Sequence, residues 1–472
     1  MSHAHEGIAG AEGATVAQAK FASALTFDRL PPEVVERMKT CVLDTLGCCL
    51  FGATQPSVRM LAQMAAGEDS GGDAIVMGTA QRASASMAAL VNATAAHSFQ
   101  LDEIHIQATL HPGSAALPAV LALAQAGGAT TSGRDVITAL VAGYETALRT
   151  GMAARGSIFT RGYHNQGATG ALAAAVAGGR LLGLDPLQMQ HALGIAGSQA
   201  AGLMAVQEGA MAKSFHCGRA SQSGVYAAKL AALGYTGIPQ VLEEPYGGFL
   251  STVAIPAQCD GAMLTAGLDE RWETLNVGYK PAPASNGSVS AMTALDTIMR
   301  EHGLVHGQIE RMTAWVSSNT LGHCGWEYTR DKVQGVLAAQ MNLRYGLAVM
   351  ALEREATAAQ FAPDRLFAPE TMAFLPRIHV EHDPKYDGHG GIYRVACRLQ
   401  VQTRDGCRHE TEVLFRKGSN EDPMSAVELR HKFLGLAAPV LGQSRAAALA
   451  ALVDRLEDLA DTTELSALLS ST

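Results

Sequence analysis

Long stretches of this chain consist of alanine, glycine, leucine and valine at helical spacing, and this feature limits the fold more than any other. Small apolar side chains favour helices that pack closely against one another. Hydrophobic residues make up 48% of the 472 residues and aromatic residues only 5%, so small side chains must fill a large core. We therefore expect a mainly α-helical protein. The clearest helical stretches are residues 31–51, 84–99, 132–153, 167–182, 186–200 and 221–233.

The pattern changes near residue 268. Apolar residues alternate in 308–318, 377–383 and 392–402, which predicts strands. The last of these runs leads through Asp405-Gly406 into the alternating sequence HETEVLF, which indicates a hairpin. A helix is expected between the strands, over 334–355. These residues predict a smaller α+β domain.

The chain becomes helical again after residue 418, over 425–436 and 443–469, whereas residues 1–18 are expected to form a loose arm. We expect the C-terminal helices to return to the first helical domain. The predicted organisation is a helical domain over 1–267, an α+β domain over 268–415, and C-terminal helices over 416–472 that complete the helical domain.

Charge and cysteine content exclude several classes of protein. The net charge of −9 is modest and no basic stripe is visible, which argues against nucleic-acid binding. None of the eight cysteines forms a CxxC pair, so we expect reduced thiols in the cytoplasm. No secretory signal is visible, and the uncharged runs 112–133 and 186–207 are too rich in polar and small residues for membrane spans.

The densest polar group of the first domain lies between two apolar stretches. It contains Gln100, Asp102, Glu103, His105 and His111. Histidines beside carboxylates suit proton transfer at neutral pH. A solvated loop between helices explains the same residues without any chemistry.

Three further polar segments could bind an anion. His164 precedes a small-residue helix whose N-terminus favours negative charge, although Asn165 could simply cap that helix. Lys213 and Arg219 could hold a carboxylate or form a basic surface turn. Prolines beside Lys280 would hold it in one place, or that segment is a linker between domains.

Signatures of several cofactor-dependent enzymes are missing. The sequence has no GxGxxG after a strand, no GxxxxGK[ST], no HExxH and no GxSxG. Nicotinamide, nucleotide, zinc and serine-hydrolase chemistry therefore lose support. The remaining histidines and lysines suit proton movement and carboxylate binding without a cofactor.

Taken together, ordered motifs along the chain resemble the MmgE/PrpD family. They run from about residue 19 to residue 436 and include NATAAHS at 92–98, LDEIH at 101–105, HPGS at 111–114, GYE with Arg149, YHNQG at 163–167, LGIAGSQAAG at 193–202 followed by Lys213 and His216, YKP at 279–281, LRY at 343–345, and KGSNEDPMS at 417–425.

This resemblance implies a helical domain made from both chain ends, a smaller α+β lid, a homodimer, no metal, and an active site between the domains. The family's site positions are matched here by Asp102, His105, His111, His164, Lys213, Lys280 and Tyr345. We assign His111, His164, Asp102, Lys213 and Tyr345 to catalysis, and Gln100, His105, Lys280 and Arg149 to substrate binding.

Three places depart from the family pattern. Gln100 replaces an acid, Ser214 follows Lys213, and the segment beyond Lys280 lacks the usual later histidine. These departures weigh against assigning the family's well-known substrates directly, and Gln100 is the first place to look for a substrate difference.

The function predicted from the sequence is a lyase or isomerase that acts on a small di- or tricarboxylate through proton abstraction next to a carboxylate. A dehydratase similar to 2-methylcitrate dehydratase is placed first. An epimerase resembling iminodisuccinate epimerase and a decarboxylase resembling cis-aconitate decarboxylase are the alternatives. A catalytically idle carboxylate-binding protein is the alternative from another class.

Overall fold

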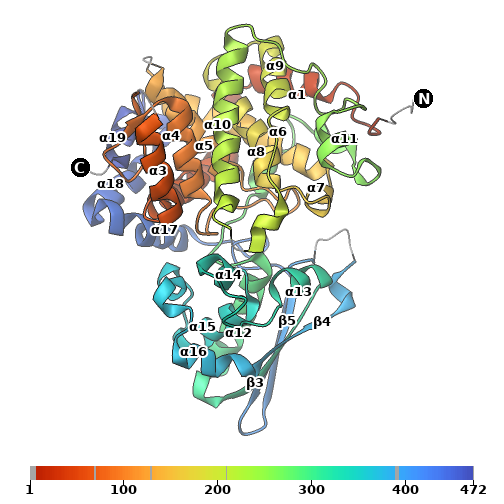
Figure 1. The fold of residues 1–472 in the computed structure, drawn as a ribbon, viewed down its shortest axis with the longest axis vertical. Helices are drawn as coiled ribbons and strands as arrows, with labels where there is room; N and C mark the ends of the chain where they lie inside the picture. Colours follow the sequence, from red (N-terminus) through yellow and green to blue (C-terminus); the bar gives the residue numbers. More distant parts are fainter. Residues whose placement is uncertain (1–6, 69–70, 128–129, 209, 389–392, 471–472) are drawn as a thin grey trace. The chain divides into compact units, whose positions relative to one another are not determined.

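The computed structural model describes residues 7–68, 71–127, 130–208, 210–388 and 393–470, and these form two compact units. The first unit comprises Met1–Ser98, Asp102–Val277 and Ala426–Thr472, and the second comprises Phe99–Leu101 and Gly278–Ser425. The structure is largely helical, as the sequence predicts (Figure 1). The lid role and the limits at 268 and 415 stay predictions.

The first unit is built almost entirely from helices. They are α1 (Ala14–Ala24), α2 (Pro32–Gly52), α3 (Pro56–Glu68), α4 (Ala85–Ala96), α5 (Pro112–Ala126), α6 (Gly133–Ala153), α7 (Ser157–Thr160), α8 (Asn165–Leu181), α9 (Pro186–Gly197), α10 (Ala212–Ala232), α11 (Phe249–Val253), α17 (Ala426–Leu441), α18 (Gln443–Asp454) and α19 (Thr463–Leu469), with a two-stranded ribbon of β1 (Ala74–Ile75) and β2 (Arg82–Ala83).

Helix α8 forms the centre of the first unit, packed against α6 on one side and α10 on the other. Small residues allow the close approach. A Cβ on Gly143 of α6 would lie 2.5 Å from the Ala173 carbonyl oxygen, and one on Gly224 of α10 would lie 2.3 Å from the Ala174 Cβ. The alanine and glycine content noted in the sequence therefore sets the spacing of these helices.

The second unit is an α+β arrangement around a four-stranded sheet of order β4-β3-β5-β6. The strands are β3 (Ile309–Val316), β4 (Ile378–His382), β5 (Cys397–Thr403) and β6 (Arg408–Val413). Strand β3 is parallel to β4 and antiparallel to β5, and β5 pairs with β6 through the predicted Asp-Gly hairpin. Alternate side chains of β5 are buried, as the period-two pattern predicts. Residue 392, at the start of the predicted strand, lies outside the described residues.

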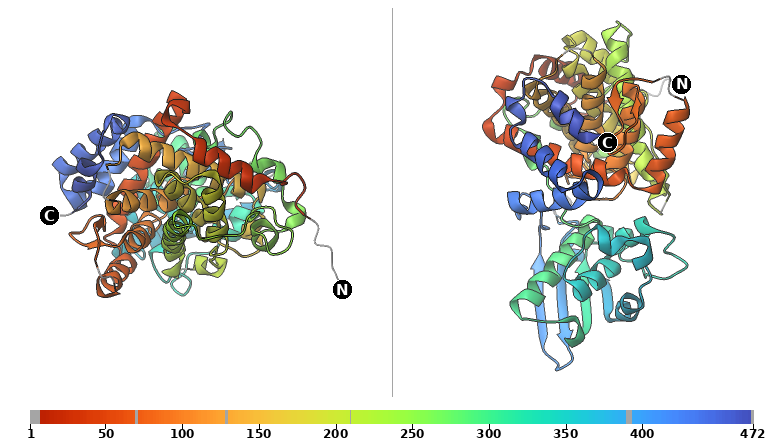
Figure 2. Two further views of the ribbon diagram at one scale, coloured as in Figure 1. Left: turned by 90° about the horizontal axis from the view of Figure 1, so that it is seen from above. Right: turned by 90° about the vertical axis from the view of Figure 1, so that its left-hand side faces the viewer.

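Helices α12 (Asn286–Glu301) and α15 (Leu343–Glu353) pack on this sheet (Figure 2). The shorter helices of the unit are α13 (Ser318–Cys324), α14 (Val336–Gln340) and α16 (Pro369–Phe374). The short segment Phe99–Leu101 is tied to this unit because the Gln340 side chain donates a hydrogen bond of 3.0 Å to the Phe99 carbonyl oxygen.

Four sequence predictions need correction. The helix expected over 221–233 begins already at Ala212, as α10. The helix expected over 334–355 is broken into α14 and α15, because Asn342 adopts extended backbone and its side chain caps Tyr345 N. The helix expected over 443–469 is interrupted between α18 and α19. The loose arm expected over 1–18 includes the start of α1, while residues 1–6 lie outside the described part of the chain.

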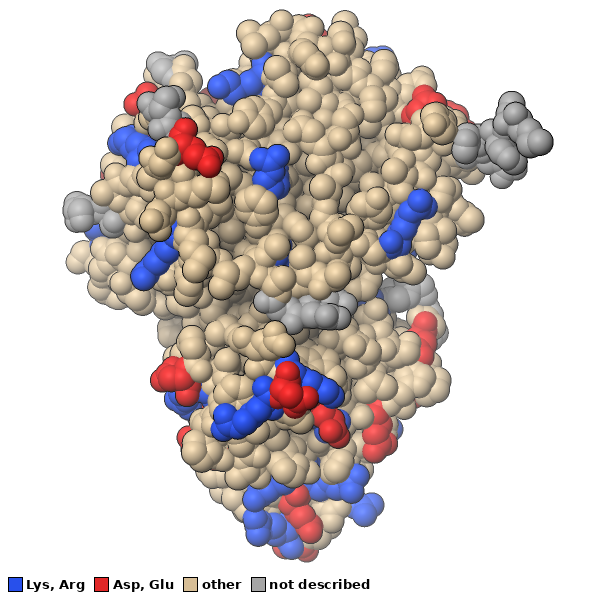
Figure 3. Space-filling model, viewed as in Figure 1, with Lys and Arg blue, Asp and Glu red and all other residues tan. Residues whose placement is uncertain are grey.

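On the face drawn in Figure 3, lysine and arginine side chains are scattered among aspartate and glutamate. In the described ranges, no helix combines the length and apolar character needed to cross a lipid bilayer.

Candidate active site

Two histidines stand at the ends of neighbouring helices in the first unit. His97 is the C-cap of α4, and His111 is the N-cap of α5, whose first residue is Pro112. Proline favours this first helical position because its missing N–H would have no partner there anyway. The chain between these helices folds back through a β-bridge between His105 and Leu110. The loop thereby returns His111 toward the end of α4.

The Asp102 carboxylate joins these two histidines. Its Oδ2 atom lies 2.8 Å from His97 Nδ1 and 3.3 Å from His111 Nδ1, and it accepts a hydrogen bond of 2.6 Å from Ser114 Oγ. Asp102 is completely buried. The hydrogen bond of His111 Nδ1, of 3.3 Å, is with the main-chain carbonyl oxygen of Asp102. A carboxylate and a carbonyl oxygen only accept hydrogen bonds, so both favour a proton on the Nδ1 atoms that face them.

The carboxyl group of Asp102 is held in its charged form. Burial by itself would raise its pKa, but His111, His97 and the Ser114 hydrogen bond outweigh burial and lower the pKa below the usual range. The buried negative charge in turn stabilises a positive charge on either imidazole.

A second pair of histidines continues the cluster. His164 is the N-cap of α8, and its Nδ1 atom lies 3.2 Å from Nδ1 of His216 on α10. The ring centroid of His97 lies 5.0 Å from that of His111 and 5.6 Å from that of His164. The four imidazoles therefore form a connected row in the order His111, His97, His164, His216.

Lys213 adds a cation to this row. It occupies the first turn of α10, three residues before His216, and only 8% of its surface is exposed. Among the residues that the structure describes, no hydrogen bond or ion pair is found for its ammonium group. Burial lowers its pKa to about 8, although the Asp102 charge acts in the opposite direction. Lys213 is thus mostly charged at pH 7 and suited to bind an anionic group.

Burial also sets the charge of the second histidine pair. It lowers the pKa of His164 well below the ordinary value of 6.5, and the positive charge of Lys213 adds to the effect. The pKa of His216 is lowered by burial, with further contributions from His97 and Lys213. At neutral pH, His164 is an uncharged imidazole beside a cationic lysine. This arrangement can bind a carboxylate and move a proton at an adjacent carbon.

The cluster contains four of the residues predicted from the sequence, namely Asp102, His111, His164 and Lys213. His97, His216 and Ser114 were not assigned roles from the sequence, although all three lie in the quoted motifs. His97 is five residues before Asp102, and His216 is one helical turn after Lys213. The second spacing was a usable signal, since residues three apart share a helix face.

His105 is turned away from this row. Its Nδ1 atom accepts a hydrogen bond of 3.0 Å from Ala108 N, and its Nε2 atom lies 3.5 Å from Glu273 Oε2. These partners give His105 a structural role in its own loop. Its assignment to substrate binding stays a prediction that these contacts do not support.

Arg149 is likewise engaged in packing. It is fully buried on α6, pairs with Glu145 at 3.4 Å and donates to the carbonyl oxygens of Ala266 and Arg271. These contacts fix the segment that leads to the end of the first unit. No described contact joins Arg149 to the histidine row.

Three predicted site residues belong to the second unit. The Tyr345 hydroxyl donates a hydrogen bond of 2.7 Å to the Gln360 carbonyl oxygen, and its ring stacks on Tyr328. Lys280 is 2% exposed, and Gln100 is buried with a left-handed backbone (φ 59°). Their roles toward a substrate stay predictions. The existing bond of Tyr345 makes it the weakest of the catalytic candidates.

His97, Asp102 and His111 also offer three atoms that could hold a metal ion, all within 4.8 Å of one another. The shared carboxylate oxygen already accepts from Ser114 and faces both imidazoles. We interpret the group as a hydrogen-bonded proton-transfer network. The absence of a metal cofactor stays a prediction, tested below.

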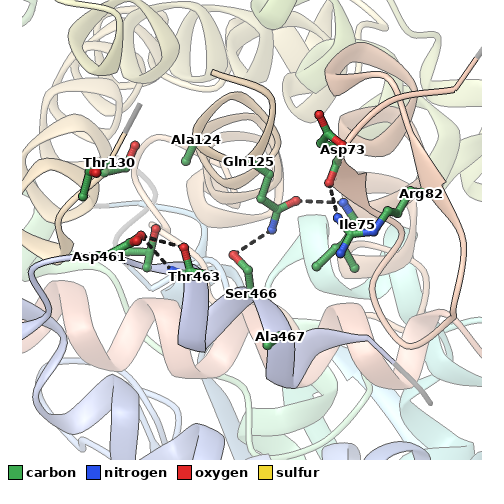
Figure 4. Close-up of a pocket in the computed structure, with 12 residues that line it drawn as sticks. Asp73, Ile75, Arg82, Ala124, Gln125, Thr130, Asp461, Thr463, Ser466 and Ala467 are labelled. Carbon is green, nitrogen blue, oxygen red and sulfur yellow. Dashed lines mark hydrogen bonds between the residues drawn. The ribbon is translucent and has the colours of Figure 1, made fainter. Parts of the chain in front are cut away.

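A separate cavity of about 340 Å³ lies in the first unit at the other end of α5 (Figure 4). Gln125 in its wall accepts a hydrogen bond from Ile75 N and donates one to Ser466 Oγ. With a helical rise of 1.5 Å per residue, this wall is roughly 20 Å along the helix from His111. The cavity is therefore distinct from the histidine cluster.

Comparison with known proteins gives one consistent result. The MmgE/PrpD N-terminal domain matches residues 17–260, and the MmgE/PrpD C-terminal domain matches residues 283–458. A cis-aconitate decarboxylase of Aspergillus terreus is 32% identical over 97% of this chain and 96% of its own length. A cis-aconitate decarboxylase-like protein of Aspergillus oryzae is 31% identical over 93% and 94%. Human cis-aconitate decarboxylase is 28% identical over 94% and 92%.

Proposed function

Because this chain belongs to the MmgE/PrpD family, we propose that it is a lyase that removes CO₂ from a small unsaturated tricarboxylate of the cis-aconitate type. The observation that carries the proposal is the Asp102 carboxylate shared by His97 and His111, within a cluster that also contains the buried Lys213. The names of the relatives support decarboxylation ahead of the dehydration that the sequence placed first.

The chemistry follows from the charges of the cluster. Lys213 binds a substrate carboxylate, and the C–C bond to the departing carboxylate breaks as CO₂ leaves. The electron pair of that bond spreads into the neighbouring unsaturated carboxylate, where the ammonium stabilises it. Protonated His111 then delivers a proton to carbon, and Asp102 stabilises the imidazolium before the transfer. One proton is consumed for each CO₂ released.

Dehydration is the second candidate, and His164 is the observation that favours it. A neutral imidazole at pH 7 has a free nitrogen that can take up a proton next to a carboxylate, and protonated His111 could then protonate a leaving hydroxyl. Epimerisation needs the same proton removal followed by its return to the opposite face. The assay must therefore distinguish three products.

The test uses cis-aconitate, 2-methylcitrate, citrate and iminodisuccinate in deuterated water, followed by NMR and by CO₂ release. We expect CO₂ and one carbon-bound deuterium from cis-aconitate. Olefin signals from 2-methylcitrate or citrate would contradict decarboxylation and indicate a dehydratase. Deuterium exchange at iminodisuccinate would indicate an epimerase. Absence of turnover and exchange with all four would favour a binding protein that performs no catalysis.

Two variants and one treatment locate the activity. His111→Ala and Lys213→Ala should each remove turnover, whereas His382→Ala, which alters an exposed histidine of the second unit, should not. Full activity after exhaustive chelation, with metal content verified, is expected from a cofactor-free enzyme. Loss of activity that a divalent metal restores would instead assign a metal to the His97, Asp102 and His111 group.

The resemblance also implies a homodimer, and the cysteine pattern together with the lack of a visible secretory signal favours a cytoplasmic location. Both stay proposals. Light scattering on the purified chain should give twice the mass of 49.3 kDa, and a monomer at assay concentration would contradict the first.

A further inference from the structure

The side chain of Gln166 forms hydrogen bonds with both main-chain polar groups of His111. Its Oε1 atom accepts from His111 N at 3.0 Å, and its Nε2 atom donates to the His111 carbonyl oxygen at 2.8 Å. Gln166 is 1% exposed, so water does not compete for these bonds. One amide group therefore fixes the peptide units on both sides of the candidate acid.

A third contact extends this arrangement to α10. Gln166 Nε2 also donates to Cys217 Sγ at 3.1 Å. Cys217 follows His216 directly and lies four residues after Lys213. Gln166 itself is in the first turn of α8, two residues after His164. A single side chain thus joins the three segments that carry His111, His164 and Lys213.

The backbone of His111 needs such support. It lies just before Pro112 with φ −102° and ψ 81°, outside the helical region, so helix α5 does not hold its N–H. On the far side, Glu103 Oε1 accepts from Gly113 N at 2.7 Å. A Cβ at Gly113 would lie 2.4 Å from the Tyr144 hydroxyl and 2.5 Å from Glu103 Oε1, so the chain passes here with no space to shift.

We propose that Gln166 is a positioning residue that sets the place of His111 relative to His164 and Lys213. The proposal rests on the proposed function, since it assumes that His111 moves a proton. It adds a residue whose side-chain hydrogen bonds go to the backbone of the acid and to Cys217, so that it acts through the placement of His111. A misplacement of about 1 Å at a reacting group can cost about 100-fold in rate.

The matched pair of variants is Gln166→Met and Gln18→Met. Gln18 is equally buried in the first unit and donates to the Leu264 carbonyl oxygen at 2.9 Å, but no histidine contacts it in the described structure. Both variants lose a buried glutamine, but Gln166 makes three hydrogen bonds and Gln18 makes one, so the free energy of unfolding of each variant is measured beside its kcat. We expect Gln166→Met to lower kcat about 10- to 100-fold with KM within about threefold, because Lys213 is untouched. Gln18→Met should stay within about twofold of the original kcat.

A second measurement needs no substrate. With ¹⁵N-labelled histidine, the His111 imidazole signals should shift or split in Gln166→Met and stay unchanged in Gln18→Met. Failure of every substrate in the panel would refute the proposed function, while these signals would still decide the proposal for Gln166.

Gln166→Glu serves if Gln166→Met does not fold, because it keeps an oxygen that accepts from His111 N and lacks the donor to the carbonyl. It should also perturb the His111 signals and lower kcat at least threefold. Unchanged His111 signals would by themselves overturn the proposal, and so would a kcat equal to that of Gln18→Met.

Discussion

The Nδ1 atom of His97 lies 2.8 Å from the Oδ2 atom of Asp102, and both side chains are almost fully withdrawn from solvent. His111 approaches the same oxygen at 3.3 Å. Asp102 thus orients two imidazoles that come from the ends of two different helices. The variants and pH changes that test these residues alter the cluster or the buried charges next to it.

Replacement of Asp102 by asparagine should abolish most of the activity. The variant keeps the size of the side chain but removes the charge that stabilises a protonated His111. We expect kcat to fall about 100- to 10,000-fold, the usual contribution of general acid–base catalysis. Steady-state kinetics measure this fall, and Asp387→Asn, which alters the partner of the exposed His382, is the control. A loss below threefold would show that Asp102 has no part in catalysis.

The activity should depend on the charge of Lys213. Its pKa is about 8 because burial disfavours the ammonium, so the protonated fraction is high below pH 8 and falls above it. We predict that kcat/KM falls tenfold per pH unit above about pH 8, and that Lys213→Arg retains a smaller activity without this decline because a guanidinium stays charged. Profiles from pH 6 to pH 10 measure the effect.

Glu103 also titrates near pH 8, so Glu103→Gln separates the two groups. If Lys213 is responsible, this variant keeps the alkaline decline. A decline that disappears in Glu103→Gln and persists in Lys213→Arg would assign the pH dependence to Glu103 instead.

The free energy of unfolding should also depend on pH because of Glu103. Burial, together with the charges of Asp44 and Asp102, raises the pKa of Glu103 from 4.5 to about 8. Between these values the folded chain holds a proton that the unfolded chain has released, so this group makes stability fall as the pH rises. The free energy of unfolding of Glu103→Gln should therefore rise relative to the unaltered chain, by up to about 1.4 kcal/mol per pH unit.

Urea denaturation at pH 5, 6.5 and 8 measures this difference. Tyr144→Phe should raise the pKa of Glu103 further, since the Tyr144 hydroxyl donates a hydrogen bond of 3.0 Å to Glu103 and lowers its pKa. Loss of that bond should extend the upper limit of the window of declining stability to higher pH, while the lower limit stays at the pKa of the unfolded chain, so this variant is also measured at pH 9. A difference that is independent of pH in both variants would refute the raised pKa.

Removal of one partner of the ion pair between Asp44 and Lys432 should lower the free energy of unfolding strongly, whereas replacement of both partners by apolar residues should lower it little. The Lys432 ammonium lies 2.6 Å from Asp44 Oδ1, and the two side chains are only 8% and 1% exposed. Asp44→Ala removes the carboxylate that pairs with the Lys432 ammonium, and we expect a loss of about 3–5 kcal/mol in the free energy of unfolding. The double variant Asp44→Leu/Lys432→Met should recover most of that loss, because neither buried charge remains.

Trp272 is the only tryptophan in the first unit, so its fluorescence can follow that unit in a background with Trp315 and Trp326 replaced by phenylalanine. Asp454→Ala removes the exposed partner of Arg430 and should cost about 1 kcal/mol or less. If Asp44→Ala were as mild as Asp454→Ala, the buried pair would have no structural importance.

The fold followed well from local patterns in the sequence. The stretches 31–51 and 132–153 closely match α2 and α6, where a proline or a capping box marks the start. The alternating run at 308–318 matches β3, and Asp405-Gly406 forms the predicted hairpin. Local signals failed where tertiary contacts decide, as at Asn342, whose cap divides a continuous apolar pattern.

The site followed only in part. The structure brings together four of the predicted residues, Asp102, His111, His164 and Lys213, as their motifs suggested. The sequence could not show that Arg149 donates its hydrogen bonds to backbone carbonyl oxygens or that His105 faces Glu273. Such partners lie more than 100 residues away along the chain. The roles of Lys280, Tyr345 and Gln100 await the variants that would test them.

The buried pair of Asp44 and Lys432 has a consequence for how this protein is made. The two residues are 388 positions apart. A ribosome that adds about 5–20 residues per second needs roughly 20 to 80 s between them, and α2 lacks its partner α17 during that time. The nascent chain must carry Asp44 hydrated or shielded until then. Chaperone demand should therefore depend on the speed of translation, more than it would in a protein whose neighbouring helices are also neighbours in sequence.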